Sequence, residues 1–597
     1  MFYRSLTDER TRRLHRARPV LALAGVAFAT GALVGANQGG SPAYGLASGF
    51  VAAWAKGDYA KMYSDISASS RRSVSASEFA ETYQNALTTA TATSLQVAGK
   101  PRTAGDSLLA VPVRVNTSLF GALALSFRLR ITEAGGESAA IAWSRSLSFP
   151  GMYPGELLSR NLTLPRRATL LARDRTVLAE SAPGASEATL SGPVTRSSPL
   201  GEVASAVLGS VGPVPPERRP ALEAQGVPAG ATVGLSGVEL ALDDSLRGRP
   251  GGELLAGRRI LASVSARPAP AVLSTVSPTL QRAAVTALGG QLGGIVAMEP
   301  ATGQILAVAG IGLDGLQPPG STFKIVTLTG VLAAAVANPH SVFPYATYAR
   351  LDGVKLNNAN GEECGGTLEL AFAVSCNSVF APLGVKLGSA RLVATAERFG
   401  FNHDPGITGA AQSTLPAAGQ IQGELDLGST AIGQGQVLAS PLEMAIVAAT
   451  VADGGRRPSP TFELGAPRAA GVPVMSASVA RTVRDLMIAV VRDGTGTSAA
   501  IPGVIVAGKT GTAELNTACS TSSEPSAAET APKESGSPGC QGTGSEASNT
   551  DAWFAAFAPA LHPRIVVAVL LVKDGAGGAT AAPVARQVLE AELTAIR

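Results

Sequence analysis

The chain has 597 residues, of which 45% are hydrophobic and 15% are charged, and its formal net charge at pH 7 is +4. This length exceeds that of one ordinary domain, and the apolar content is sufficient for several hydrophobic cores. So small a net charge gives no support for a nucleic-acid-binding protein. The composition therefore indicates a globular protein of several domains.

The N-terminal segment predicts a membrane anchor. Several arginines precede an apolar run over residues 19–36, and this run is just long enough to span a bilayer. The positive flank predicts a cytoplasmic tail over residues 1–18 and an extracytoplasmic body after the run. The expected location is the cell membrane, with a single span. A cleaved signal peptide is the alternative, with a weak cleavage site near Ala36.

Residues 45–149 predict a compact α+β domain that follows a short polar linker. Apolar residues recur at helical spacing over residues 49–66 and again over 75–87, where Ser75 or Ser77 is a candidate N-cap. Three alternating segments then predict strands, at 108–118, 121–131 and 139–149. Two helices followed by an antiparallel sheet is the expected arrangement.

Residues 150–270 predict an irregular, β-rich module. This part of the chain is rich in Pro, Gly and Arg and has few long periodic runs. Residues 165–180 predict two short strands that are joined by a polar turn at Arg173–Arg175.

The chain from residue 275 to residue 597 has the clearest patterns and predicts a further domain. A helix at 278–291 precedes two strands at 293–299 and 305–310. Later segments predict strands at 504–515, 551–560 and 563–574, and a final amphipathic helix at 585–596. The polar, low-complexity residues 516–550 predict a disordered insertion between two of these strands.

Four cysteines occur in the chain, and their spacing matches no zinc motif. Outside the membrane, disulfides are permitted. Cys519 and Cys540 flank the predicted insertion and are the expected pair, with two free thiols as the alternative. Cys376 is expected to pack beside the cleft described below.

Histidine chemistry has little support in this sequence. The chain has 4 histidines, none of which lies in a metal-ligand pattern: His15, His340, His403 and His562. A Ser-His-Asp triad is therefore poorly supported, and no G-x-S-x-G elbow occurs. The close glycines at 433–438 and 494–499 lack a strand–helix context, so both segments are expected to be loops.

A serine precedes a lysine by one helical turn in PPGSTFK, residues 318–324. The Pro-Pro-Gly sequence cannot continue a helix, so it predicts a helix start at Ser321, with Lys324 on the same face. A buried lysine loses basicity and can accept the proton of a serine nucleophile. In isolation, however, this motif is more often an ordinary serine cap beside a solvated lysine.

Two further motifs change this interpretation. Ser375-Cys376-Asn377 follows a helical pattern, and Lys509–Thr512, KTGT, lies on a predicted strand. S-x-x-K, S-D-N and K-T-G together mark β-lactamases and penicillin-binding proteins. Here Cys376 replaces the aspartate. Each motif alone would indicate only a turn, but three in the right order and context predict a serine nucleophile with a lysine base.

The sequence resembles the class B penicillin-binding proteins, which are monofunctional D,D-transpeptidases. The segments PPGSTFK, SCNSVF, AIGQGQVLASPLEMA, AGKTGTAEL and DAWFAAFAP are all similar to that family. RATLLARDRTVLAE and GLSGVELALDDSLRG resemble its pedestal motifs, although the first is degraded at Ala168 and Thr176. Residues 45–149 look like the NTF2-like domain of the methicillin-resistance type.

The resemblance implies a multidomain α+β fold. It consists of an NTF2-like domain, a β-rich pedestal or dimerisation module at 150–270, and a serine β-lactamase-like transpeptidase domain at 275–597. In that last domain, helices flank an antiparallel sheet.

The resemblance also implies roles for individual residues. The implied catalytic residues are Ser321 as nucleophile, Lys324 as base, and Ser375 with Lys509 as a relay that protonates the leaving D-alanine. The implied substrate-binding residues are Asn377, Thr510, Gly511 and Thr512. No metal or organic cofactor is implied.

The implied partners are peptidoglycan stem peptides with their lipid-linked precursors, β-lactam antibiotics, and a membrane glycosyltransferase within a wall-synthesis complex. Two alternatives remain at this point. One is a D,D-carboxypeptidase or β-lactamase that uses the same motifs with water as the acceptor. The other is a non-catalytic penicillin-binding scaffold or sensor, although only about eighteen residues precede the apolar run, too few for a cytoplasmic effector domain.

Overall fold

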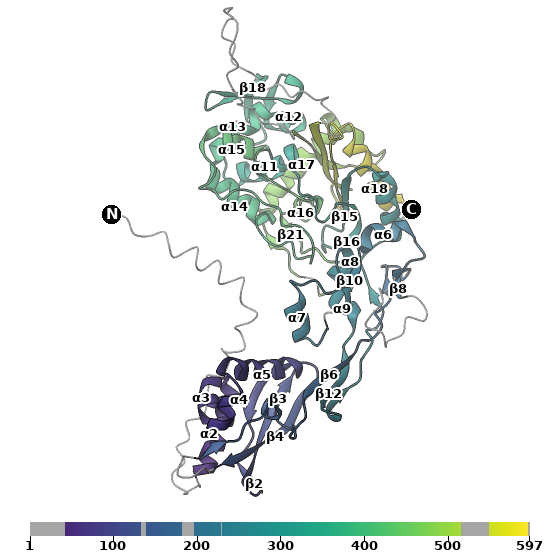
Figure 1. Cartoon of the computed structure of the whole chain (residues 1–597). Coiled ribbons are helices and arrows are strands. Elements are labelled where there is room, and N and C mark those ends of the chain that lie inside the picture. The colour runs from purple at the N-terminus through teal and green to yellow at the C-terminus, as the bar shows by residue number, and fades with distance from the viewer. Residues whose placement is uncertain are drawn as a thin grey trace, which may run out of the picture.

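The computed structural model describes residues 42–132, 139–181, 196–228, 230–467, 469–514 and 549–594. The predicted anchor, nearly all of the predicted insertion, and both Cys519 and Cys540 lie outside these ranges. Figure 1 shows an elongated molecule, with an N-terminal domain at one end, a large C-terminal domain at the other, and a narrow connecting module between them.

Within the described ranges, no single helix is long and apolar enough to cross a membrane. Two consecutive helices, α13 (Asn377–Leu387) and α14 (Ser389–Phe399), meet the criterion only as a pair, and they are bent by 100°.

The N-terminal domain packs four helices against one face of a sheet with the strand order β1-β3-β4-β5, with β2 also paired to β3. Its helices are α2 (Pro42–Lys56), α3 (Tyr59–Asp65), α4 (Ala68–Ser73) and α5 (Ala76–Thr89). Its strands are β1 (Ala92–Val97), β2 (Arg102–Gly105), β3 (Leu108–Thr117), β4 (Gly121–Thr132) and β5 (Ala140–Ile141). Of the two candidate caps, Ser75 is the one that caps α5, through its side chain and the Glu78 amide.

Two expectations for this domain were wrong in detail. The two predicted helices are four, because turns at Asp58, Ser67 and Ser75 each begin a new helix. The strand expected at 139–149 is only the two-residue β5, followed by a 3₁₀ turn at Arg145–Leu147. Residues 146–149 are all buried, which a strand with one solvent-facing side cannot achieve.

The connecting module has two parts, which we call the stem and the head. The stem is a three-stranded antiparallel sheet of β6 (Leu158–Thr163), β12 (Gly251–Ala256) and β13 (Arg259–Val264). The predicted pair of short strands is present in the head as β7 (Leu170–Leu171) and β8 (Val177–Ser181). The other elements of the head are β9 (Arg196–Ser197), α6 (Glu202–Leu208), β10 (Val211–Pro213), α7 (Arg219–Ala224), β11 (Thr232–Gly234), α8 (Gly237–Ala241), α9 (Asp243–Arg247) and β14 (Val272–Leu273).

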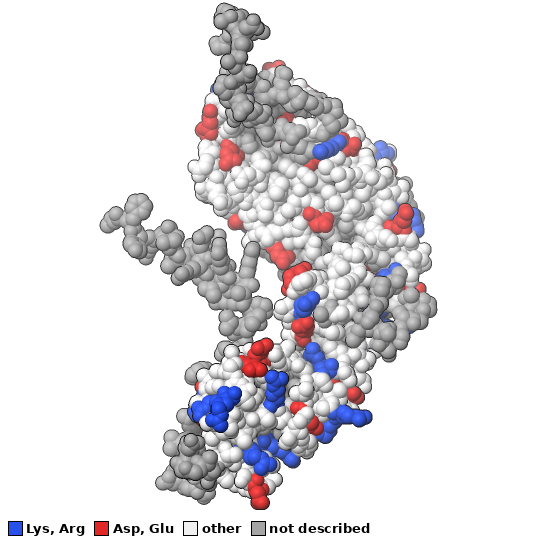
Figure 2. All heavy atoms as spheres, viewed as in Figure 1, with Lys and Arg blue, Asp and Glu red and all other residues white. Residues whose placement is uncertain are grey.

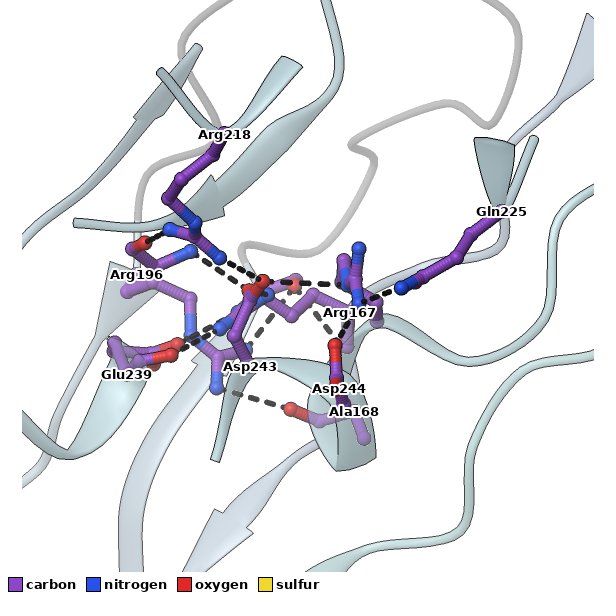
Figure 3. A network of polar contacts seen from close by, with 11 residues as sticks. Arg167, Ala168, Arg196, Arg218, Gln225, Glu239, Asp243 and Asp244 are labelled. Carbon is purple, nitrogen blue, oxygen red and sulfur yellow. Dashed lines mark hydrogen bonds and ion pairs between the residues drawn. The ribbon is translucent and has the colours of Figure 1, made fainter. Parts of the chain in front are cut away.

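A buried ion network fixes the head (Figure 3). Arg167 donates to Glu239 at 2.6 Å and to Asp243 at 2.7 Å, and these three side chains are at most 4% exposed. Arg196 donates to Glu239 at 2.7 Å, and Arg218 donates to Asp243 at 3.0 Å. The network joins the two segments in which the sequence resembles a pedestal, since Arg167 begins one of them and both acids lie in the other.

The C-terminal domain is built on a five-stranded antiparallel sheet with the order β16-β15-β25-β24-β23. The strands are β15 (Gly293–Met298), β16 (Ile305–Gly310), β23 (Ala507–Glu514), β24 (Thr550–Ala558) and β25 (Ile565–Leu571). Helices α10 (Pro278–Leu288) and α18 (Ala581–Thr594) contact one face, and α16 (Pro441–Ala452) contacts the other. Burial on both faces explains why the inner strands are continuous apolar runs rather than alternating ones.

The remaining helices of this domain are α11 (Lys324–Ala333), α12 (Leu368–Ala373), α13, α14, α15 (Gly423–Ala431) and α17 (Ala477–Asp493). Its short strands are β17 (Val342–Ala346), β18 (Tyr348–Leu351), β19 (Val354–Asn357), β20 (Cys364–Thr367), β21 (Arg456–Arg457) and β22 (Val472–Pro473). Single 3₁₀ turns occur at η3 (Gly320–Phe323), η4 (Ala359–Gly361) and η5 (Thr497–Ala499).

Charge is distributed unevenly along the molecule. Figure 2 shows Lys and Arg side chains gathered over the N-terminal domain and stem, whereas the C-terminal domain presents broad uncharged surfaces with scattered acidic groups. The face seen in this view therefore offers no extended basic surface to attract an anionic ligand to the C-terminal domain.

Candidate active site

The predicted serine–lysine pair lies where a 3₁₀ turn passes into α11. Ser321 belongs to η3 and is half-buried, and Lys324 is the first residue of α11 and is fully buried. The expected α-helical start at Ser321 is therefore a tighter 3₁₀ turn. Among the described residues, no hydrogen bond joins the Ser321 hydroxyl to the Lys324 amine. Ser321 is also not the N-cap residue of either helix, since these residues are Pro319 for η3 and Phe323 for α11.

A glycine allows this turn to approach the edge strand of the sheet. Gly320 has φ of +50°, and a Cβ atom at this position would lie 2.6 Å from the carbonyl oxygen of Thr512 on β23. Any other residue would be strained in this conformation and would push the turn away from β23. The Pro-Pro-Gly sequence therefore sets how closely Ser321 lies to the KTGT strand.

Lys324 is held by the SCN segment. Its Nζ atom donates to the Ser375 carbonyl oxygen at 2.6 Å and to Asn377 Oδ1 at 2.6 Å, and lies 3.4 Å from Ser375 Oγ. Burial, and next to it the charge of Lys509, lower the pKa of Lys324 well below its ordinary value. A neutral amine has two N–H groups, which these two close acceptors satisfy, and one lone pair, which remains available to accept a proton.

Lys509 approaches Ser375 from strand β23. Its Nζ atom donates to Ser375 Oγ at 2.9 Å and to the Thr510 carbonyl oxygen at 3.1 Å. Burial lowers the pKa of Lys509 to about 7. The Ser375 hydroxyl therefore lies between two buried amines, one from α11 and one from β23. Ser375 itself has a left-handed φ of 63°, so its position depends on the surrounding contacts.

The predicted substrate-binding residues lie beside the two buried lysines. Asn377 begins α13 and donates through Nδ2 to the Asn357 carbonyl oxygen at 3.0 Å. Thr510, Gly511 and Thr512 lie on β23, which is an edge strand and so has backbone groups that the sheet does not pair. Thr512 Oγ1 accepts a hydrogen bond from the Gly577 amide at 3.4 Å.

Two residues near these threonines were not predicted from the sequence. Thr495 Oγ1 lies 2.5 Å from Thr510 Oγ1, and Gln434 Nε2 donates to the Thr512 carbonyl oxygen at 3.5 Å. Both belong to the glycine-containing segments that were expected to be loops; the first is a loop, whereas the second ends in the 3₁₀ turn η5. The clustered glycines were a signal of close backbone approach, but nothing in the sequence indicated which strand they approach.

A disulfide joins Cys364 to Cys376. The expectation that Cys376 simply packs beside the cleft was therefore incomplete, because it is covalently tied to β20. The expected Cys519–Cys540 pair lies outside the described residues. Sequence spacing gave no signal for the observed pair, because β20 and the SCN segment are brought together by the fold.

Three sequence profiles match successive parts of the chain. The NTF2-like N-terminal transpeptidase domain matches residues 43–156, the penicillin-binding protein dimerisation domain 183–259, and the penicillin-binding protein transpeptidase domain 293–590. Peptidoglycan D,D-transpeptidase PbpA of Mycolicibacterium smegmatis is 32% identical over 422 residues, which cover 60% of this chain and 79% of that protein. The chain belongs to the class B penicillin-binding proteins.

A further relative and a solved structure are also similar to this penicillin-binding protein. Peptidoglycan D,D-transpeptidase MrdA of Acinetobacter baumannii is 25% identical, with 66% of each chain covered. The D,D-transpeptidase domain of a peptidoglycan glycosyltransferase from Eggerthella lenta is 30% identical, covers 72% of this chain and 98% of that one, and has a TM-score of 0.54. These matches confirm the predicted family and the predicted multidomain α+β fold.

A structure of penicillin-binding protein A from Mycobacterium tuberculosis, described as a ceftriaxone acyl-enzyme complex, is also similar to this penicillin-binding protein. It is 26% identical, covers 72% of this chain and 98% of that one, and has a TM-score of 0.54.

Proposed function

We propose that this class B penicillin-binding protein is a serine-type peptidoglycan D,D-transpeptidase with Ser321 as its nucleophile. One observation carries the proposal: Lys324, one turn after Ser321, is fully buried and its pKa is lowered, so the amine is available as a base. The names of the relatives support the activity. The serine mechanism and the role of each residue are our inference from the cleft.

In the first step, the Ser321 hydroxyl attacks the carbonyl carbon of the penultimate D-alanine of a stem peptide. Lys324 takes the hydroxyl proton, and a tetrahedral intermediate forms on Ser321 Oγ, which becomes the acyl ester only when the peptide C–N bond breaks. Negative charge develops on the former carbonyl oxygen. The backbone N–H groups of Ser321 and Thr512 are the proposed donors to this oxygen, because such preorganised donors stabilise the transition state.

The peptide C–N bond then breaks, and the leaving D-alanine nitrogen needs a proton. Ser375 Oγ lies 3.4 Å from Lys324 Nζ and 2.9 Å from Lys509 Nζ, which makes it a suitable relay. Thr510 and Thr512 would bind the terminal carboxylate, with Gly511 allowing close approach of the strand. Lys509 would add positive charge, and Asn377 would bind the backbone on the acyl side.

In the second step, an amine of a neighbouring stem peptide attacks the ester, which forms the cross-link and restores the Ser321 hydroxyl. A β-lactam resembles the D-Ala-D-Ala end and would acylate Ser321 as a stable ester. We further propose that the protein acts at the cell membrane, held by residues 19–36, beside a membrane glycosyltransferase that supplies the glycan strands.

The nucleophile assignment can be tested with a fluorescent penicillin. The Ser321→Ala variant should lose covalent labelling completely, because the ester can form only on this hydroxyl. Ser389→Ala is the matched control, since this serine begins α14 outside the cleft, and it should label like the wild type. Labelling of Ser321→Ala at the wild-type rate would overturn the assignment.

The acceptor can be tested with a D-Ala-D-Ala stem peptide and an amine donor. A transpeptidase yields the cross-linked product and free D-alanine in equal amounts. Release of D-alanine without cross-linked product would instead favour a carboxypeptidase, and rapid turnover of a chromogenic cephalosporin would favour a β-lactamase.

A further inference from the structure

The disulfide between Cys364 and Cys376 lies at the centre of the proposed catalytic machinery. We propose that it is a positioning device for acyl transfer, which holds Ser375 and Asn377 against Lys324 and Lys509, so that its reduction slows acylation of Ser321. This inference rests on the proposed function, and it assigns to both cysteines a role that the S-x-N motif does not contain.

Cys376 occupies the position between the two residues that bind the lysines. It is 1% exposed, its predecessor Ser375 contacts both amines, and its successor Asn377 accepts from Lys324 Nζ at 2.6 Å. Since Cys376 is bonded through the backbone to both neighbours, any displacement of its Cα atom moves them too. The left-handed φ of Ser375 makes this segment one that relaxes if it is not held.

Cys364 is the partner of Cys376 in the disulfide. It lies on β20, where it pairs with Ala346 of β17, and it is 8% exposed. Asn358 reinforces the same junction: its Nδ2 donates to the Ala346 carbonyl oxygen at 2.7 Å, and its Oδ1 accepts from the Ser378 amide at 2.8 Å. The disulfide is therefore the covalent member of a set of contacts that join residues 342–367 to the start of α13.

The segment that contains Cys364, residues 342–367, is small. It consists of two separate two-stranded sheets, β17–β20 and β18–β19, which are not paired with the five-stranded sheet. The strands β17 and β19 are mostly exposed. Two-stranded sheets are marginally stable on their own. Hydrogen bonds to such a segment hold the SCN residues only while the segment itself stays ordered, whereas a disulfide maintains the connection.

The chemical step in the test is complete without any further reagent. Tris(2-carboxyethyl)phosphine breaks the S–S bond and becomes the phosphine oxide, while water supplies its oxygen and the two protons of the resulting thiols. Removal of the reagent and air oxidation restore the disulfide. The proposal thus predicts a reversible change in acylation rate in the wild-type chain, with no substitution required.

The experiment measures the second-order rate of labelling by a fluorescent penicillin for the full chain. It compares oxidised wild type, wild type reduced and desalted without oxygen, reoxidised wild type, and the variant Cys364→Ser/Cys376→Ser. Alkylation and mass spectrometry verify the redox state. The reduced protein and the variant should be acylated about tenfold or more slowly, since a misplacement of about 1 Å can cost 10²-fold in rate, and reoxidation should restore the rate.

A pH profile separates positioning from simple destabilisation. Water admitted by a loosened SCN segment would weaken the burial that keeps the pKa of Lys324 low, so the rise in acylation rate with pH should move to higher pH. Loss of folded protein would lower the amplitude of labelling at every pH without moving the profile. The control Cys519→Ser/Cys540→Ser should respond to the reductant exactly as the wild type does.

The outcomes are distinguishable from failure of the proposed function. If the reduced wild type and the double variant keep the oxidised rate and pH profile, the positioning role is wrong while Ser321 remains the nucleophile. A slower rate with an unmoved pH profile also overturns it, in favour of a purely structural disulfide. Labelling of Ser321→Ala at the wild-type rate would overturn the nucleophile assignment, and none of the outcomes for the disulfide depends on it.

Discussion

Lys324 and Lys509 are both fully buried in the cleft of this penicillin-binding protein. Burial of an amine without a carboxylate partner disfavours its charged form, and both pKa values are lowered. The charge of Lys509 also disfavours the ammonium form of Lys324, as the second cause of its lowered pKa. The two lysines can therefore carry one ammonium proton between them. A catalytic cycle that first removes a proton from the serine and later donates one to the leaving group requires such a state.

The lowered pKa of Lys509 has a consequence for stability. Between the folded value of about 7 and the ordinary value of 10.5, the unfolded chain binds a proton at this lysine that the folded chain has lost. The free energy of unfolding should therefore rise with pH through this window, by up to about 1.4 kcal/mol per pH unit. Urea denaturation at pH 7, 8 and 9 measures the slope. Lys509→Met should lack this contribution, and parallel pH curves for the two proteins would contradict the assignment.

For individual residues, the sequence predicted which residue types would lie together in the site, but not which side chains would be in contact. The S-x-x-K spacing and the Pro-Pro-Gly sequence indicated that Ser321 and Lys324 share one face of a helix start, and only the two further motifs favoured a catalytic lysine over a solvated one. The contact of Lys509 with Ser375 joins residues 134 positions apart, and only the motif resemblance suggested it. The hydroxyl contact of Thr495 with Thr510 was not predictable, because neither periodicity nor spacing records which loop faces an edge strand.

Elements with a single strong pattern were predicted closely. The strand expected at 305–310 is β16, and the helix expected at 278–291 is α10, which begins at Pro278 and ends at Leu288. The segment 139–149 was predicted wrongly, because alternating apolar residues also occur in an irregular segment, here one in which residues 146–149 are all buried. The small helices of the head were not predicted, since each has only 5 to 7 residues, too few to give a clear helical pattern.

The ion network of the head gives a matched test within one short helix. Asp243 of α9 is 2% exposed and accepts from Arg167, Arg218 and the Gly234 amide. The Asp243→Asn variant should lose about 3–5 kcal/mol of unfolding free energy, because it leaves buried arginine charge uncompensated. The neighbouring Asp244 side chain is 84% exposed, so Asp244→Asn should cost less than about 1 kcal/mol. Equal effects in urea denaturation would show that the network does not stabilise the head.

On the scale of the whole molecule, the connecting module shares the two large hydrophobic cores of its neighbouring domains, and it has in addition a small cluster of its own, formed by Val214, Leu222, Val227, Ala231 and Val233. The stem residues Leu254 and Ala256 belong to the same buried cluster as the N-terminal domain. The head residues Leu170 and Leu178 belong to a cluster that extends into the C-terminal domain, as far as Phe323 behind the cleft. The three matched family profiles therefore do not correspond to three independent cores. Sequence patterns could not predict this division, because it depends on long-range packing.

Two cores predict two unfolding transitions in calorimetry. Leu254→Ala, at a fully buried stem position, should destabilise only the unit that contains the N-terminal domain, and Leu170→Ala only the unit that contains Ser321, each by about 2–5 kcal/mol. Acylation by a β-lactam should raise only the second transition, which identifies it. Leu157→Ala is the control, because this stem-adjacent leucine is 63% exposed and should shift neither transition. A single transition that both core variants lower equally would mean that the head and stem transmit stability along the whole molecule, so that the N-terminal domain and the cleft unfold as one unit.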